Sequence, residues 1–298
     1  LGIKTFIHEQ NSIPGLSNKI LSHKVDKIGV SLEDSIKYFD KNKTVFTGNP
    51  RSEEVINAKP VIKSKYGLKT NKKLVLIVMG SLGSMTMNNK LKEAISCFKD
   101  KDYEVLFVTG KNYFDDYKKT INIPSNVKIV PYLDDMLSVM KRTDLMVTRT
   151  GASTIAEITA LGIPSILVPS PYVTHNHQYK NALVLEKNNA AVIIEEDKFN
   201  GEILTKTIDD ILNDSKYYEM LVTLLIPCYL KDITIENKIL TGNKKNGKQI
   251  GDKFQIECSC HKSNYMKECI FSNIESFVSK KELILRSLRQ KKRNHEIE

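Results

Sequence analysis

Short runs of Val, Ile and Leu recur along the middle of this chain, and longer segments with apolar residues at helical spacing separate them. The runs are continuous and do not alternate with polar residues, which is typical of strands buried on both faces of a parallel sheet. Six strands are expected on this basis, at residues 74–79, 103–109, 127–130, 144–148, 165–168 and 190–194. The pattern therefore predicts an α/β domain built on a doubly wound parallel sheet.

Two of the intervening segments have clear helical periodicity. Residues 88–98 carry Leu91, Ile95 and Phe98 on one face, and residues 134–140 carry three apolar residues at similar spacing. Apolar residues spaced in this way form one stripe along a helix. We expect both helices to pack on the core.

The first 50 residues show the same alternation on a smaller scale. Strands are expected at residues 5–8, 27–30 and 44–46, and helices at 15–22 and 32–39. Residues 50–73 surround a short helix with Pro60 and Gly67, which is typical of an inter-domain connection. The alternation stops near Asp214. We therefore expect the end of an N-terminal α/β domain at 1–50, a second domain at 51–214, and an atypical basic tail with cysteines at 215–298.

The tail has no periodicity that links it to the preceding domain. It contains glycines among lysines at 242–251 and a basic helix candidate at 280–293. It is a separate small module, a disordered extension or a translation artefact. A loose zinc ligand set and unstructured thiols are both compatible with its cysteines, because the first pair is closer than structural zinc sites prefer. These residues are Cys258, Cys260, His261 and Cys269.

With 298 residues, the chain can bury a large core without disulfides or metals. No apolar run approaches the ~20 residues that span a bilayer, so we expect no transmembrane helix. Five cysteines, an odd number, and the lack of a signal peptide favour a reducing, cytoplasmic setting. Because the chain starts at Leu1, in the approach to an expected strand, we expect an upstream part to be missing.

The formal net charge is +10, and the last 78 residues carry 15 Lys and Arg against 9 Asp and Glu. A basic surface favours nucleic acid, an anionic membrane face or a phosphorylated substrate. The chain has no Trp, and its Tyr and Phe residues are scattered, so it lacks the stacking platform of single-strand binders. Nucleic acid is therefore the weakest of the three options.

Two loops that follow expected strands are candidates for binding an anion. Residues 80–84 (GSLGS) contain glycines that permit a tight turn and expose backbone N–H groups, although a plain strand-to-helix turn is an equal alternative. Residues 148–157 (TRTGASTIAE) open a helix with small and hydroxyl residues, and Glu157 could accept both hydroxyls of a ribose. The alternative is that Thr150 or Ser153 merely caps this helix. We favour the ligand site, because such folds bind nucleotides at the carboxyl ends of strands.

Two further polar segments have the chemistry of a binding site. Residues 175–182 (HNHQYKNA) offer amide and imidazole groups that suit a ligand with many hydroxyls, such as a sugar. His175 and His177 have no carboxylate at helical spacing, so we expect no metal there. Residues 8–11 (HEQN) end a strand and are expected to face a ligand, and Arg51 could meet a phosphate. Each segment could instead be an ordinary polar loop.

Taken in order, seven segments resemble the MurG family of glycosyltransferases, from His8 to about Asp214: HEQNSIPGLSNK, GNPR, GSLGS, VPYLDDM, RTGASTIAEI, GIPSILVP and HNHQYKNA. The resemblance implies the GT-B fold, in which a Rossmann-like C-terminal domain binds UDP-GlcNAc and an N-terminal α/β domain takes the acceptor, lipid I. It implies transfer of GlcNAc to lipid I, which forms lipid II in peptidoglycan synthesis. It also implies a peripheral position on the anionic, cytoplasmic face of the bacterial plasma membrane.

By position within the motifs, the resemblance also implies a set of substrate-binding residues. These are Asn11 for the sugar, Arg51 for the phosphates, Ser81 for the diphosphate, Leu133 beside the uracil, Ala152, Ser153, Thr154, Ile155, Ala156 and Glu157 for the diphosphate and ribose, and His177 and Gln178 for the GlcNAc hydroxyls. No metal or other cofactor is implied. The catalytic base stays unassigned, because the family's glycine-rich loop with its proposed histidine has no counterpart in this chain.

The chain departs from the family at several points. Met79 and Leu82 replace a glycine and a glutamine of the family's loop, and the acceptor-docking patch and the C-terminal helix have no clear counterparts. We therefore expect a chain that binds the donor but transfers little GlcNAc. Two alternatives stay open, which are another glycolipid-forming transferase that uses UDP-sugars and a non-catalytic nucleotide-sugar-binding fragment.

Overall fold

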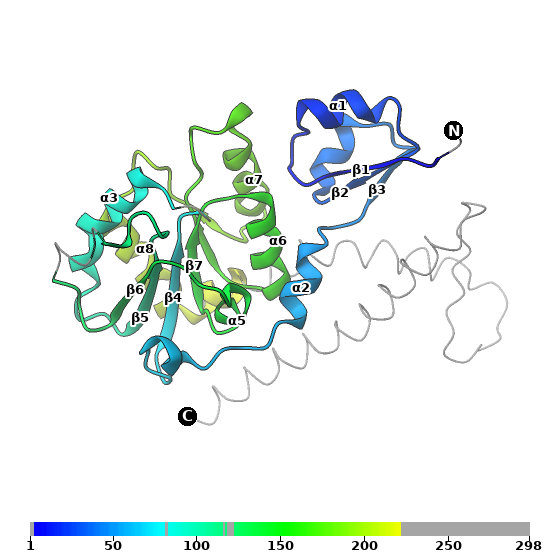
Figure 1. Cartoon of the computed structure of the whole chain (residues 1–298). Coiled ribbons are helices and arrows are strands. Elements are labelled where there is room, and N and C mark those ends of the chain that lie inside the picture. Colours follow the sequence, from blue (N-terminus) through cyan, green and yellow to red (C-terminus); the bar gives the residue numbers. More distant parts are fainter. Residues whose placement is uncertain (1–2, 81–82, 116, 118–121, 222–298) are drawn as a thin grey trace, which may run out of the picture. The chain divides into compact units, whose positions relative to one another are not determined.

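The computed structural model describes residues 3–80, 83–115, 117 and 122–221 (Figure 1). Within these residues the strands form two parallel sheets, one of three strands and one of six. The tail beyond residue 221 lies outside the described residues, and so do the expectations for its cysteines, its glycines and its basic helix candidate.

The smaller sheet contains β1 (Phe6–Glu9), β2 (Lys27–Val30) and β3 (Thr44–Phe46), in the order β1-β2-β3. α1 (Leu16–Ser22) and the 3₁₀ helix η1 (Glu33–Tyr38) connect these strands. The elements lie where the sequence predicts them, within a residue or so at their ends. The segment expected as an ordinary helix at 32–39 is a 3₁₀ helix. Its Ser35 hydroxyl donates to the Leu32 carbonyl at 2.6 Å, a local bond that competes with α-helical pairing.

The larger sheet contains β4 (Lys73–Val78), β5 (Tyr103–Val108), β6 (Val127–Val130), β7 (Leu145–Thr148), β8 (Ser165–Leu167) and β9 (Val192–Ile193). Its strand order is β6-β5-β4-β7-β8-β9, with every neighbouring pair parallel. This is the order of a doubly wound sheet built outward from its first strand. All six predicted strands are present, and the expectation differs from the structure only at strand ends.

Further helices are α2 (Arg51–Asn57), η2 (Lys63–Tyr66), α3 (Met85–Ala94), η3 (Ile95–Phe98), α5 (Met136–Met140), α6 (Ala152–Leu161), η4 (Thr174–Asn176), α7 (His177–Glu186) and α8 (Gly201–Asn213), and residues 215–221 are also helical. The helix expected at 88–98 begins earlier, at Met85, because the Ser84 side chain caps it by accepting from the Met87 N–H. Its last turn is the 3₁₀ helix η3.

Helices cover both faces of the larger sheet, as the continuous apolar strands predicted. In β4, Val75 and Ile77 belong to the core beneath α3, η3 and α8, whereas Leu74 and Leu76 belong to the core beneath α5, α6 and α7. Figure 1 shows α3 and α8 on one side of this sheet and α6 on the other. The side-chain alternation of a buried strand therefore builds two cores.

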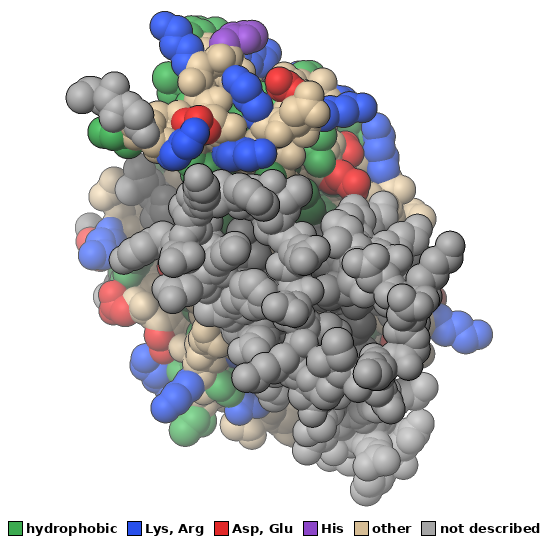
Figure 2. Space-filling view, turned by 90° about the vertical axis from the view of Figure 1, so that its right-hand side faces the viewer, with side chains coloured by type: hydrophobic (Ala, Val, Ile, Leu, Met, Phe, Trp, Pro, Cys, Tyr) green, Lys and Arg blue, Asp and Glu red, His purple; other side chains and the backbone are tan. Residues whose placement is uncertain are grey.

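The described surface is mixed in character. On the face shown in Figure 2, Lys and Arg side chains are interspersed with acidic and apolar ones. α1 buries none of its side chains and exposes Leu16, Ile20 and Leu21. Among the described residues, no helix combines the length and apolar character needed to cross a bilayer.

Candidate functional site

The candidate site lies where the connections of the larger sheet change direction. β4 and β7 are neighbours, but the chain leaves β4 toward β5 and leaves β7 toward β8, on opposite sides. Doubly wound sheets bind ligands at the carboxyl ends of the strands that flank this point. The predicted loops at 80–84 and 149–151 follow these two strands, so the fold brings both to the same edge of the sheet.

Glycine is required at two positions of the loop after β4. Gly80 and Gly83 have φ angles of 99° and 78°, a backbone conformation that residues with a side chain rarely adopt. A Cβ at Gly83 would lie 2.3 Å from the Thr109 carbonyl oxygen, so the loop backbone packs directly on the end of β5. Ser81 and Leu82 lie outside the described residues, and the expected contact of Ser81 with a diphosphate stays a prediction.

The N-terminus of α6 is free of side-chain caps. Its N-cap residue is Gly151, and the first turn contains no acidic residue. The Ile155 N–H donates to the Gly151 carbonyl at 3.0 Å, whereas the N–H groups of residues 152–154 have no partner within the helix. Three donors and the positive end of the helix dipole therefore stand at the carboxyl end of β7, an arrangement that suits an anion.

Several predicted site residues have buried side chains. Ile155 is part of the core, and Ala156 is also buried. Leu133 is 2% exposed and packs in the same core as Ile155, so only its backbone is available to a nucleobase. The neighbouring Tyr132 is 48% exposed, and the Lys111 Nζ lies 5.1 Å from the centre of its ring. From α6 itself, the groups available to a ligand are thus the backbone of its first turn, the exposed Ser153 and partly exposed Thr154 side chains, and the carboxylate of Glu157.

The structure brings together two residues for which separate roles were predicted. Arg51, the first residue of α2, donates from Nε to Glu157 Oε1 at 2.6 Å, and it also pairs with Glu54. The hydrogen bond to Glu157 is the main cause that raises the pKa of Arg51 above its ordinary value. Arg51 therefore holds the carboxylate expected to accept ribose hydroxyls.

α7 presents two of the predicted sugar-binding residues. The His177 Nδ1 lies 2.9 Å from the Thr174 carbonyl oxygen, which can only accept, so Nδ1 carries the proton and Nε2 is the acceptor in the neutral ring. Gln178 Oε1 accepts from the Ser170 N–H at 2.9 Å, which leaves its amino group to donate elsewhere. The backbone carbonyl of Gln178 accepts from the Thr150 hydroxyl at 2.7 Å, so a hydrogen bond connects the loop before α6 to α7.

Asn11 takes part in a network that sequence reasoning missed. Asn181 is fully buried, and its Nδ2 donates to Asn11 Oδ1 at 3.1 Å and to the Thr150 carbonyl at 3.3 Å. Its Oδ1 accepts from both the N–H and the hydroxyl of Ser12 at 2.9 Å. The expectation that all of HEQN faces a ligand is wrong for Glu9. This carboxylate is buried and accepts hydrogen bonds within its own loop, including one from the Asn11 N–H at 2.9 Å.

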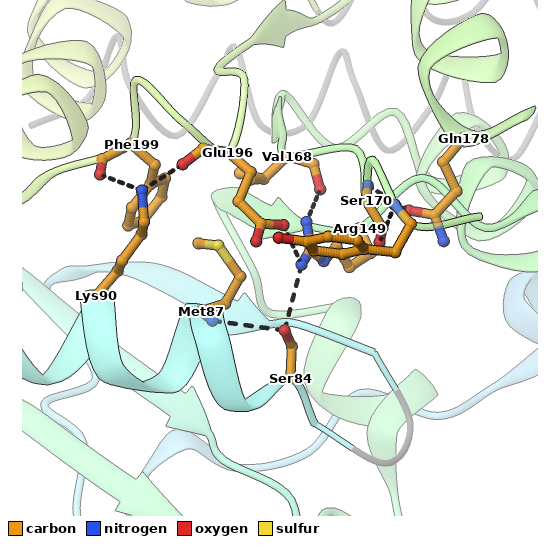
Figure 3. A network of polar contacts seen from close by, with 10 residues as sticks. Ser84, Met87, Lys90, Arg149, Val168, Ser170, Gln178, Glu196 and Phe199 are labelled. Carbon is orange, nitrogen blue, oxygen red and sulfur yellow. Dashed lines mark hydrogen bonds and ion pairs between the residues drawn. The ribbon is translucent and has the colours of Figure 1, made fainter. Parts of the chain in front are cut away.

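A buried ion pair between Arg149 and Glu196 was also missed (Figure 3). Their charged groups lie 2.6 Å apart, and the Arg149 guanidinium also reaches Ser84 and Val168. The signal in the sequence is an arginine that directly follows a mostly apolar strand. Within the described residues, no group of three or more His, Cys, Asp and Glu side chains could hold a metal ion.

Comparisons with known proteins bear on the family and the fold of the chain. The N-acetylglucosamine transferase of Halalkalibacterium halodurans that acts on N-acetylmuramyl-(pentapeptide) pyrophosphoryl-undecaprenol is 48% identical over 217 residues, which cover 71% of this chain and 60% of that protein. The first such transferase of Bacillus cereus is 47% identical over 221 residues, 72% of this chain and 60% of that protein. This chain thus spans about 60% of the length of these curated relatives.

The crystal structure of MurG from Acinetobacter baumannii superposes with a TM-score of 0.60 at 22% identity, over 79% of this chain and 66% of that one. This likeness confirms the predicted GT-B fold, and the named relatives confirm the resemblance that the motifs indicated. The model of the glycosyltransferase family 28 C-terminal domain matches residues 74–223, which contain the whole larger sheet apart from the first residue of β4. The chain therefore belongs to glycosyltransferase family 28.

Proposed function

We propose that this chain supplies the donor-binding part of an inverting transfer of GlcNAc from UDP-GlcNAc to lipid I, which forms lipid II. The observation that carries the proposal is the uncapped N-terminus of α6 at the carboxyl end of β7, with Glu157 one turn further along. The names of the relatives, which are N-acetylglucosamine transferases, support the same reaction.

In this proposal the diphosphate binds the N–H groups of residues 152–154 and the loop at 80–84. Donors that are already oriented stabilise the negative charge that develops on the departing UDP, and they need no rearrangement when the bond breaks. The acceptor hydroxyl displaces UDP in one step, so the configuration at the sugar carbon inverts. No nucleophilic side chain is required for this step.

Gln178 and His177 have complementary groups for the sugar. The Gln178 amide has its oxygen occupied by Ser170, so its amino group donates. In the tautomer that donates from Nδ1 to the Thr174 carbonyl, the His177 Nε2 accepts. An acceptor and a donor at adjacent positions of α7 can pair with neighbouring hydroxyls of GlcNAc, whereas a sugar that lacks one of them would leave a polar group unpaired.

Peripheral attachment to the anionic, cytoplasmic face of the plasma membrane is part of the proposal. α1 exposes Leu16 and Ile20 beside Lys19, and apolar side chains next to a basic one suit the surface of an anionic bilayer. Sedimentation with phosphatidylglycerol vesicles tests this. The paired substitution Leu16→Ser and Ile20→Ser should lower the bound fraction, and an unchanged fraction would remove α1 from this role.

Titration calorimetry tests the donor assignment. We expect saturable binding of UDP-GlcNAc, competition by UDP, and weaker binding of UDP-glucose. Failure of both UDP and UDP-GlcNAc to bind would refute the proposal, and equal binding of UDP-glucose would favour another glycolipid transferase. Transfer of labelled GlcNAc to lipid I then separates an enzyme from a fragment that only binds the donor.

A further inference from the structure

Asn181 is a fully buried residue of α7 that the proposed chemistry does not use. It follows Gln178 by three positions and His177 by four, so the three residues belong to one face of the helix. Gln178 and His177 are the residues proposed to bind the sugar. A buried side chain on the same face can act on the sugar only through a neighbour.

The hydrogen bonds of Asn181 permit a single orientation of its amide. Its Oδ1 lies 2.9 Å from the backbone nitrogen of Ser12, which can only donate. Its Nδ2 lies 3.3 Å from the Thr150 carbonyl oxygen, which can only accept. Exchanging the two ends of the amide would set donor against donor and acceptor against acceptor. The Nδ2 group of Asn181 is therefore fixed as the donor to Asn11 Oδ1, at 3.1 Å.

This donor fixes the orientation of Asn11 in turn. Because Asn181 donates, the end of the Asn11 amide that faces it is the oxygen. The Asn11 Nδ2 then lies on the other side, where one of its hydrogens bonds to Glu9 Oε1 at 3.3 Å. Its second hydrogen has no partner among the described residues, and Asn11 is only half-buried. Asn11 thus offers a donor, and not an acceptor, to a ligand.

The loop that carries Asn11 is held in shape by its own chain. Glu9 is 2% exposed, and its carboxylate accepts from the Asn11 N–H at 2.9 Å, the Gly15 N–H at 3.0 Å and the Asn18 amide at 2.8 Å. These bonds do not involve Asn181, so the loop keeps them when Asn181 is replaced. What Asn181 contributes to Asn11 is the bond that keeps its oxygen away from the ligand.

The loop before α6 has a further bond to α7. The Thr150 hydroxyl donates to the backbone carbonyl of Gln178 at 2.7 Å, so this loop stays attached without Asn181. Binding of the diphosphate by the first turn of α6 should therefore depend little on Asn181. We infer that Asn181 is a positioning residue that acts through Asn11 and holds its amino group as a donor to a hydroxyl of GlcNAc, an inference that rests on the proposed function.

The test compares binding of UDP-GlcNAc with binding of UDP, which has no sugar. In titration calorimetry, Asn181→Ala should raise the Kd for UDP-GlcNAc about threefold to tenfold, the effect of one neutral hydrogen bond, and change the Kd for UDP by about twofold or less. A role confined to stability would change both affinities or neither. Asn11→Ala should give the same pattern, and adding it to Asn181→Ala should change the Kd by about twofold or less, since the two residues act as one unit.

Asn126→Ala is the matched control. Asn126 is also a buried asparagine, 8% exposed, and its Nδ2 donates to the carbonyls of Phe98 and Tyr103 at 2.9 Å and 3.1 Å. It directly precedes β6, so it lies at the amino ends of the strands, at the opposite edge of the sheet from the candidate site. Its replacement should lower the melting temperature by an amount similar to that of Asn181→Ala and leave both affinities unchanged.

A second variant and a measurement on the unaltered chain cover the case in which Asn181→Ala does not fold. Asn181→Ser leaves a hydroxyl that can accept from the Ser12 N–H, but this hydroxyl lies one bond short of the amide nitrogen that reaches Asn11. It should show the same selective loss of affinity for UDP-GlcNAc. In NMR spectra of the ¹⁵N-labelled wild-type chain, UDP-GlcNAc should shift the side-chain amide resonances of Asn11, and UDP should not.

Three results would overturn the inference while the proposed diphosphate site stands: unchanged affinity for UDP-GlcNAc in the Asn181 variants, an equal loss of affinity for UDP, or losses that add when Asn11→Ala is combined with them. Side-chain resonances of Asn11 that UDP-GlcNAc leaves unmoved would also overturn it, and so would wild-type binding of UDP-GlcNAc that is no tighter than that of UDP. If the wild-type chain binds neither ligand, the proposed function fails, and this inference fails with it.

Discussion

Replacing Glu157 with Gln should weaken UDP binding more than it destabilises the chain. The Glu157 side chain is 11% exposed, and its Oε1 accepts from Arg51 Nε at 2.6 Å. Glutamine keeps the shape but loses the charge and one of the two acceptor oxygens. A hydrogen bond to a charged group contributes about 1.5–3 kcal/mol, so a loss of one such bond to a ribose hydroxyl raises the Kd roughly 10-fold to 150-fold.

The cost to stability is smaller. The Arg51 side chain is 38% exposed, and solvent screens its ion pair with Glu157. We therefore expect Glu157→Gln to lower the free energy of unfolding by about 1 kcal/mol or less. Because the chain has no Trp, urea unfolding followed by circular dichroism is the suitable measurement of stability. Titration calorimetry with UDP measures the affinity.

Glu54→Gln provides a matched control for this prediction. Glu54 pairs with the same arginine, but its side chain is 63% exposed and no ribose contact is assigned to it. It should leave the affinity for UDP nearly unchanged. An unaltered affinity in Glu157→Gln, or an equal loss in both variants, would refute the reasoning that Glu157 is the ribose acceptor.

Three further predictions concern other residues. Asn181→Ala should lower the free energy of unfolding by about 2–4 kcal/mol in urea titrations, because it removes a buried side chain that bonds to Ser12, Asn11 and Thr150. A loss near zero would contradict this. Gln178→Ala should weaken UDP-GlcNAc binding but not UDP binding in calorimetry, and equal losses would show that Gln178 does not contact the sugar. The pKa of Asp26 is lowered from 3.8 to about 2, chiefly by the Thr5 backbone N–H, so its stabilising effect is present above about pH 4 and is lost as the pH falls toward 2. The Asp26→Asn variant should therefore have a lower melting temperature than wild type at neutral pH, and the difference should disappear between pH 4 and 2. A difference in melting temperature that does not depend on pH would contradict this.

The sequence predicted the fold more completely than the site. Continuous apolar runs such as 74–79 and 103–109 have a single satisfactory environment, the middle of a parallel sheet, so they indicated the strands and the helices that cover them. The loops after β4 and β7 were predicted as candidate ligand loops, and the strand order of the structure makes them neighbours. The type of helix at η1 differed from the expectation because local side-chain bonds, such as that of Ser35, are decided by geometry and not by periodicity.

The side-chain pairings of the site could not be predicted from the sequence. Arg51 meets Glu157 only because α2 packs on α6, and Arg149 meets Glu196 only because β9 lies beyond β8. Both pairs join residues far apart in the chain, so no local spacing indicates them. Glu9 shows why the role of a polar residue at a strand end could not be predicted either, since the same residue type can face a ligand or accept hydrogen bonds from its own loop.

The proposed function depends most directly on binding of the UDP-GlcNAc diphosphate by the first turn of α6. Titration of ¹⁵N-labelled chain with UDP-GlcNAc, followed by NMR, observes the three N–H groups directly. We predict saturable shifts of the amide resonances of Ala152, Ser153 and Thr154, which uridine does not reproduce because it has no phosphate. Saturable binding that leaves these three resonances unmoved would contradict the account.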